Sequence, residues 1–588
     1  MGFNARDIEL GEMLIENDVV YSIPRYQRPY SWGKEEHGNL WDDLLEAYYE
    51  KTPLFFGSVI LYQEEDSNEM QIVDGQQRFT TLTILFAAIR DELLSLGKSG
   101  LMEATSIQSD LIETRVTFGD RRKKLRVQEG VSEYFLQHYQ EMGVGASDDS
   151  SKIRSIKRMK SSYEHFRACI SQLIGRLSDS EAAVEKLKEL TRSINNTRLI
   201  RIVVSDSDEA YSIFETVNAR GSPLAPSDLI KNHIFRNIRE DGAGVDRAKD
   251  LWGQITSNLT GDPSDAEKQY DLTKFIRYHW MSKYDFTTVK ELYPKIKKSG
   301  INMDEFLEDL VKDSNIFGDM LNSRLGPYFS DPSMYRYYKG AEASLTNISD
   351  MNVDQSYVFI LSLLRNTQRL QKLKDGNRPH EALKMIELFN FAYHVVCTLP
   401  ANRVERLYSD CARTLEKSCN TPNLPKKAAF EALYSKLEEL WPSEELFVEK
   451  FSDLTVKKSY KSRSMIRYIF SQLELYDSTG EMEISKEITI EHVLPQKPDK
   501  WGLTQKEVSG YVNSIGNLVL LSRPLNGGVG NKPLKEKLAE GLSDSELKIT
   551  SELVDLIKSR DEIRWGRRDI EERAVDLAKR GYRDIWSV

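Results

Sequence analysis

Residues 488–496 read ITIEHVLPQ, and residues 514–521 read SIGNLVLL. Residues 488–490 and 518–521 are short apolar runs rich in branched side chains, which is typical of β-strands. Residues 533–538 follow with a proline and then helix-forming residues, so a helix begins there. The order of a strand, a long loop, a second strand and a helix predicts a ββα unit in this part of the chain.

This predicted unit carries a histidine beside a carboxylate, Glu491-His492, and asparagines at positions 517, 526 and 531. Histidine can serve as a general base because its ordinary pKa lies near neutral pH. Hydrolysis of a phosphodiester also needs a cation, and the oxygen atoms of Glu and Asn suit Mg²⁺ or Mn²⁺. The alternative interpretation is that Glu-His ends a strand and the asparagines cap turns.

Mixed α/β structure is predicted before residue 95, with strands over residues 19–23, 55–62 and 70–73 and a helix over residues 77–96. Further along, residues 105–195 have a helical pattern and residues 199–204 form another predicted strand. Residues 245–450 carry helical periodicity with few strand signals, so a mostly helical middle region is expected.

Two polar motifs stand out near the N-terminus, IPRYQRPYSW at residues 23–32 and IVDGQQRFTTL at residues 72–82. The second predicts a strand, a tight turn and a helix start, where free backbone N–H groups and the helix dipole favour a phosphate. Arg78 adds a planar fork for phosphate oxygens, and Asp74 could hold a cation or orient water. The alternative is an ordinary strand–turn–helix with a solvated arginine. The physical chemistry of these residues alone favours neither a phosphate site nor this alternative.

The composition describes an ordinary globular chain of 588 residues, which suggests about three or four domains. The net charge of −10 excludes a basic character of the whole chain, so a contact with nucleic acid needs local basic patches. The runs at residues 121–124 and 457–463 are candidates, and a solvated charged face is the alternative for each. Four cysteines without a CxxC pair, no apolar run long enough for a membrane helix and no secretory signal indicate a cytoplasmic protein.

The C-terminal motifs resemble those of the HNH, or ββα-metal, nucleases, in the variant found in GmrSD-type type IV (modification-dependent) restriction enzymes, a group related to SspE and BrxU. The resemblance extends to the tail, with Arg564, Trp565, Arg573 and Trp586. It implies that His492 is the general base and Glu491 a metal ligand. It further implies that Asn517 is the central asparagine, counted among the catalytic residues, and that Asn526 is the second metal ligand, with Asn531 as its rival.

The N-terminal motifs resemble the ParB-like domain of the same group, together with FFGSVIL at residues 55–61 and FETVNARGSPL at residues 214–224. In that group the domain binds and hydrolyses a nucleoside triphosphate (NTP). The resemblance implies an NTP site with the following residues: Asp74 as a catalytic and binding residue, Gln76, Gln77 and Arg78 beside it, Tyr26, Gln27 and Arg28 as a facing wall, and Asn218 and Arg220 as weaker candidates.

Together these observations predict a multidomain α+β protein with a ParB-like α/β domain at residues 1–240, a helical region at 241–449 and an HNH nuclease domain at 450–588. The expected function is an NTP-dependent, modification-sensing DNA endonuclease of anti-phage defence, with Mg²⁺ or Mn²⁺ and an NTP as cofactors and modified phage DNA as its partner. The alternative is a nucleotide-switched DNA-binding sensor with an inactive HNH fold. No membrane partner is expected, and the oligomeric state stays open, with a homodimer among the alternatives.

Overall fold

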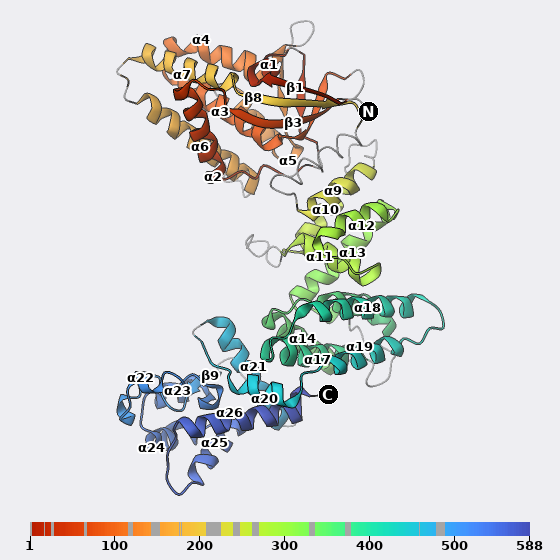
Figure 1. Ribbon diagram of the computed structural model, residues 1–588, viewed down its shortest axis with the longest axis vertical. Coiled ribbons are helices and arrows are strands. Elements are labelled where there is room, and N and C mark those ends of the chain that lie inside the picture. Colours follow the sequence, from red (N-terminus) through yellow and green to blue (C-terminus); the bar gives the residue numbers. More distant parts are fainter. Residues whose placement is uncertain are drawn as a thin grey trace. The chain divides into compact units, whose positions relative to one another are not determined.

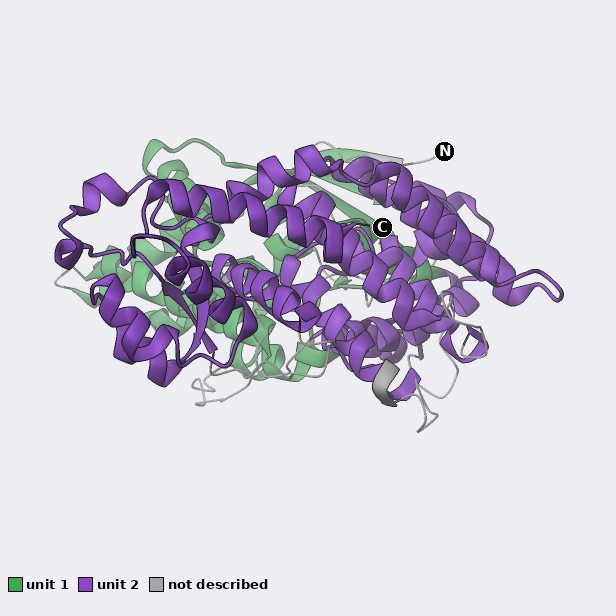
Figure 2. Cartoon of the chain, turned by 90° about the horizontal axis from the view of Figure 1, so that it is seen from below, with its two compact units in different colours: residues 1–236 green, residues 237–588 purple. Residues whose placement is uncertain are grey.

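The computed structural model describes residues 3–587 apart from 17, 25, 26, 28, 64–66, 116–120, 143–152, 176, 178, 207–224, 239–246, 261–269, 329–334, 371–377, 458 and 478–487. The chain divides into two compact units, residues 1–236 and residues 237–588 (Figure 2). The second unit contains both the helical region and the C-terminal region that the sequence distinguishes.

A six-stranded mixed sheet forms the centre of the first unit, in the order β1-β8-β3-β4-β2-β7. Its strands are β1 (Phe3–Glu9), β2 (Val20–Ser22), β3 (Phe55–Gln63), β4 (Glu69–Asp74), β7 (Leu125–Arg126) and β8 (Arg198–Val204). β8 is antiparallel to β1 and parallel to β3, whereas β4 is antiparallel to β3 and parallel to β2. The four strands predicted from apolar runs, β2, β3, β4 and β8, are all present.

Helix α3 (Gln76–Ser95) is buried over most of its length, because helices pack around it as well as the sheet (Figure 1). The surrounding helices of this unit are α1 (Leu10–Ile15), α2 (Lys34–Glu50), α4 (Lys98–Ile107), α5 (Glu129–Phe135), α6 (Arg154–Ile174) and α7 (Ser180–Asn195). A second, small apolar cluster joins Ile60, Val73 and Val204 to Leu229 of α9 (Pro226–Asn237). The turn before α3 is therefore held by packed elements.

The helical expectation for residues 105–195 was wrong over residues 113–115 and 121–126, which contain β7 and a separate two-stranded ribbon. That ribbon pairs β5 (Glu113–Arg115) with β6 (Arg121–Lys123). The physical reason is cross-strand charge pairing, because the Glu113 carboxylate lies 2.8 Å from Lys123 and 3.4 Å from Arg121. The predicted basic run is thus largely engaged within the protein, and the Lys124 side chain is buried.

The helical part of the second unit confirms the predicted mostly helical middle. Its helices are α10 (Arg247–Asn258), α11 (Leu272–Lys283), α12 (Val289–Lys298), α13 (Met303–Leu321), α14 (Tyr335–Met351), α15 (Tyr357–Arg365), α16 (Thr367–Leu370), α17 (Pro379–Asn390), α18 (Ala401–Asn420), α19 (Lys427–Leu440), α20 (Glu444–Ser452) and α21 (Tyr460–Asp477). None of the helices in the described part of the chain combines the length and the apolar character that crossing a membrane requires.

The C-terminal region is built on an antiparallel hairpin of β9 (Ile488–His492) and β10 (Leu518–Ser522). Short helices lie in the loop and after it, and longer helices complete the region: α22 (Gln505–Val508), α23 (Arg523–Val529), α24 (Leu534–Lys537), α25 (Lys548–Lys558) and α26 (Arg567–Gly581). One face of the hairpin, with Ile490 and Leu520, packs on a core shared with the helical region. The other face, with Val519 and Leu521, packs on a separate core.

Candidate functional site

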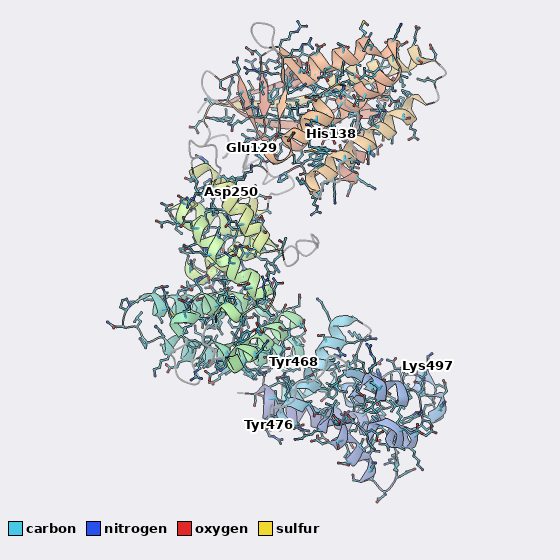
Figure 3. The ribbon with its side chains drawn as sticks, turned by 180° about the vertical axis from the view of Figure 1, so that it is seen from behind. Glu129, His138, Asp250, Tyr468, Tyr476 and Lys497 are labelled. Atoms are coloured by element: carbon cyan, nitrogen blue, oxygen red, sulfur yellow. The ribbon has the colours of Figure 1, made fainter. Side chains whose placement is uncertain are left out.

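His492 is the last residue of β9, and its imidazole is only partly exposed. Its Nε2 atom lies 3.1 Å from Oδ1 of Asn513, and the Gln496 side chain donates to the same oxygen at 2.8 Å. The Gln496 Nε2 atom also lies 3.3 Å from His492 Nε2. In the tautomer in which Nε2 donates to Asn513 Oδ1, which can only accept, Nδ1 holds the lone pair. Nδ1 is therefore the atom that can take a proton. Figure 3 labels two residues that help to locate this region, Lys497 on the loop after β9 and Tyr468 of α21.

The surroundings of His492 favour its neutral form. Burial lowers the pKa of the imidazole, and the positive charges of Lys537 and Arg463 lower it further, whereas the hydrogen bond to Asn513 opposes them. A neutral imidazole at neutral pH is the form that a general base requires. Arg463 belongs to the basic segment 457–463, so this predicted patch lies close enough to act on His492.

That basic segment is attached to the loop that orients His492. The Val456 backbone N–H donates to the Asn513 carbonyl at 2.8 Å, and Thr455 forms a β-bridge with Ser514. Lys457 and Arg463 are exposed. Arg463 therefore places an exposed positive charge close enough to His492 to act on it, and exposed cationic side chains of this segment can contact a phosphate backbone.

Glu491 is buried and faces the opposite side of the hairpin from His492. The two side chains could share one face only if the strand broke between them, but β9 remains paired with β10 through His492, so their side chains alternate. Lys537 of α24 connects them: its Nζ lies 2.6 Å from Glu491 Oε1 and donates to the His492 carbonyl at 2.7 Å. Burial raises the pKa of Glu491, and the ammonium group opposes this shift.

Asn517 holds the loop that follows β9. Its Nδ2 donates to the carbonyls of Leu494 and Val512 at 2.9 and 2.7 Å, and its Oδ1 accepts from the Leu494 N–H and the Trp565 indole at 2.9 and 3.1 Å. These contacts use both hydrogens and both lone pairs of the carboxamide. Asn517 is fully buried, and the structure places it as a positioning residue.

The two rival asparagines have different surroundings. Asn526 donates to Thr489 Oγ1 at 2.7 Å and to the Ile490 carbonyl at 3.3 Å, which places it on the same face of β9 as Glu491. Its Oδ1 accepts no hydrogen bond from the residues that the structure describes. Asn531 is exposed after α23. Of the two asparagines, Asn526 is thus the one that is bonded to the strand carrying Glu491.

One carboxylate and one carboxamide oxygen on the same face suit a hard divalent cation that keeps several water ligands. In the described part of the chain, no three His, Cys, Asp or Glu side chains gather into a metal-binding group. The residues present therefore fit Mg²⁺ or Mn²⁺ held by Glu491 and Asn526, and they do not offer a closed, all-protein metal cage.

The two N-terminal motifs adjoin each other in the first unit. Gln27 Nε2 donates to the Val73 carbonyl at 2.8 Å, and Gln77 Oε1 accepts from the Ser31 N–H at 2.7 Å. Gly75 begins α3 with φ of 103°, a left-handed conformation that glycine adopts without strain. The predicted wall residues Tyr26 and Arg28, and the weaker candidates Asn218 and Arg220, lie outside the described residues.

Arg78 makes its contacts within the protein. Its guanidinium donates to the carbonyls of Phe56 at 2.5 Å and Ser58 at 2.6 Å, and it lies 3.3 Å from Asp74. Gln76 differs, because its Oε1 is buried and has no hydrogen-bond partner among the described residues. In the DGQQR motif, the Gln76 oxygen and the first N–H groups of α3 are thus polar groups that a ligand can contact.

The sequence was compared with models of known protein families, and two of them match. A model described as the GmrSD restriction endonuclease, N-terminal domain, matches residues 10–235, and one described as the GmrSD restriction endonucleases, C-terminal domain, matches residues 441–580. The chain belongs to the GmrSD family. The two matches together span more than half of its length, and a search of curated proteins gave no match.

This GmrSD protein is accordingly a DNA endonuclease of restriction defence, with DNA as its partner. The candidate site around His492 lies inside the matched C-terminal domain, and the DGQQR motif lies inside the matched N-terminal domain. Both family domains therefore contain the residues that the sequence motifs singled out.

The sequence patterns did not point to two residues of the candidate site, Asn513 and Lys537. Asn513 immediately precedes the SIGN motif at residues 514–517, and this neighbourhood is the feature of the sequence that could have indicated a role for it. Lys537 lies among several charged residues, a pattern typical of a solvated helix, so no signal marks it. The tail residues have structural contacts: Trp565 donates to Asn517, and Arg573 donates to the Gly516 and Leu518 carbonyls.

Arg78→Ala should lower the free energy of unfolding of the first unit by about 2 kcal/mol, because it removes charge-assisted hydrogen bonds to two carbonyls of β3. Circular dichroism during urea denaturation measures this change. Arg126→Ala, at an exposed ion pair with Glu69, is the matched control and should change stability by less than about 0.5 kcal/mol. Equal stability of the wild type and Arg78→Ala would contradict a structural role for Arg78.

Proposed function

We propose that this GmrSD protein is an NTP-dependent, modification-sensing endonuclease that cuts DNA with a metal-dependent HNH site. The observation that carries the proposal is the orientation of His492: Asn513 fixes Nε2, so the lone pair of Nδ1 is left to accept a proton. Glu491 and Asn526 supply oxygen ligands on the opposite face of the hairpin from the His492 side chain.

In the proposed reaction, Nδ1 of His492 takes a proton from the water that attacks the scissile phosphate. Asn513 keeps the imidazole in the required orientation, and Asn517 keeps the following loop in place. A divalent cation, when bound, supplies positive charge that offsets the charge building on the phosphate. Lys457 and Arg463 attract the DNA backbone beside the histidine.

The NTP-binding part of the proposal rests on the turn before α3. The left-handed Gly75, the N–H groups at the start of the helix and the Gln76 oxygen without a partner support a phosphate and sugar contact there. Asp74 at the end of β4 is the proposed residue for cation or water. NTP binding then biases the protein between an inactive and an active state.

One plasmid sequence, prepared unmodified, with modified bases and with phosphorothioate linkages, tests the proposal. We expect cleavage of at least one modified form with Mg²⁺ or Mn²⁺, a change in its rate on adding ATP or GTP, and no cleavage of the unmodified form. Agarose gels of initial nicking rates measure this. Equal cleavage of all forms would identify a non-specific nuclease, and no cleavage of any form would favour the sensor with an inactive site.

A further inference from the structure

Lys537 is a fully buried lysine whose ammonium group lies inside the candidate nuclease site. Its side chain has 0% exposure, and its Nζ contacts Glu491 Oε1 at 2.6 Å and the His492 carbonyl at 2.7 Å. Lysine is rarely fully buried unless its charge is paired. A cation is thus already part of this site, and two hard oxygen atoms hold it.

Packing explains why the ammonium group stays there. Helix α24 begins at Leu534, after Pro533, and both Leu534 and Leu538 belong to the apolar core beneath this face of the hairpin. Their burial directs the Lys537 side chain inwards to Glu491. Lys535 on the same short helix is exposed, so of the two lysines of α24 it is Lys537 whose side chain points into the protein.

The oxygen atoms that hold Lys537 are of the kind that Mg²⁺ and Mn²⁺ prefer. A divalent cation on Glu491 would come within a few ångströms of the ammonium group, in a poorly solvated place where like charges repel strongly. The carboxylate can therefore pair well with one of these cations at a time.

We propose that Lys537 acts as an internal substitute for the metal, so that a divalent cation binds Glu491 only by displacing the Lys537 ammonium from it. The inference rests on the proposed metal-dependent site. In the metal-free protein, Lys537 keeps the buried carboxylate paired and connects Glu491 to the backbone of His492 across the hairpin. Lys537 is thus a positioning residue that sets the metal affinity of the site.

Mn²⁺ binding to the full chain tests this, measured after chelation of metals by the electron paramagnetic resonance signal of free Mn²⁺. Removing the competing charge in Lys537→Met should tighten binding at least tenfold, and Lys535→Met, the matched control on the same helix, should bind as the wild type does. Glu491→Gln identifies the site, because Mn²⁺ bound there should be lost in that variant and in Glu491→Gln combined with Lys537→Met.

Lys537→Gln provides a second variant in case Lys537→Met does not fold, because its neutral amide can still donate to Glu491 or to the His492 carbonyl. It should also bind Mn²⁺ more tightly than the wild type. Equal or weaker Mn²⁺ binding in a folded Lys537 variant would overturn the competition and leave the nuclease proposal standing. If neither the wild type nor the Lys537 variants bind Mn²⁺ in a manner that depends on Glu491, the metal site of the proposed function fails, and the inference fails with it.

Discussion

His492→Ala is expected to reduce DNA cleavage by about 10²–10⁴-fold, the usual effect of removing a general base. The variant loses the Nδ1 lone pair. His492 is the one histidine after His394 in the sequence, so no histidine of the C-terminal region can replace this base. The imidazole contacts only the side chains of Asn513 and Gln496 among the hydrogen-bond partners in the described part of the chain, and Gln496 and Asn513 also bond each other, so the fold should survive its removal. Initial nicking rates on the DNA that the wild type cuts best measure the loss.

His394→Ala in the helical region is the matched control, because it also removes one partly exposed imidazole from the same unit. It should leave cleavage unchanged. The melting curves of His492→Ala and the wild type, followed by circular dichroism, should coincide. Cleavage by His492→Ala at the wild-type rate would show that another group accepts the proton, and the assignment of the site would then be wrong.

The parts of the fold that the sequence predicts are those set by local patterns. β3 and β4 are apolar runs, and Asp74-Gly75 is a turn signal, so the strand–turn–helix was found correctly. β1 was missed because residues 3–9 (FNARDIE) carry three charges and little periodicity. This strand exists because it pairs with β8, nearly two hundred residues later, and an Asp7–Arg198 ion pair joins the two.

The same distinction applies to the candidate site. The sequence motifs singled out His492 and Asn517 as candidates, and the paired strands β9 and β10 bring them close together. The contacts of Asn513 and Lys537 with the candidate site are made across the fold, and a lysine in a charged segment gives no sign that it is buried. Adjacent residues of a regular strand face opposite ways, so Glu491 and His492 do not share a face, and the Lys537 ammonium contacts both the Glu491 carboxylate and the His492 carbonyl.

Gly516→Ala is expected to destabilise the C-terminal region by roughly 3 kcal/mol, because there is no room for a methyl group. A Cβ atom at Gly516 would lie 2.0 Å from the Ile570 carbonyl oxygen and 2.9 Å from the Ala574 nitrogen, both in the backbone of α26. Backbone atoms of a packed helix cannot rotate away as a side chain can, so α26 or the hairpin must shift.

That shift would also disturb the nuclease site, because Asn517 is the next residue and Arg573 of α26 donates to the Gly516 carbonyl. Cleavage should therefore fall together with the thermal stability of the second unit. Gly510→Ala, in the same loop with nothing within 4 Å of the added Cβ, should change stability by less than about 0.5 kcal/mol. If the two variants melt alike, the close approach of α26 to the hairpin is absent in solution, and the support it gives to Asn517 is absent with it.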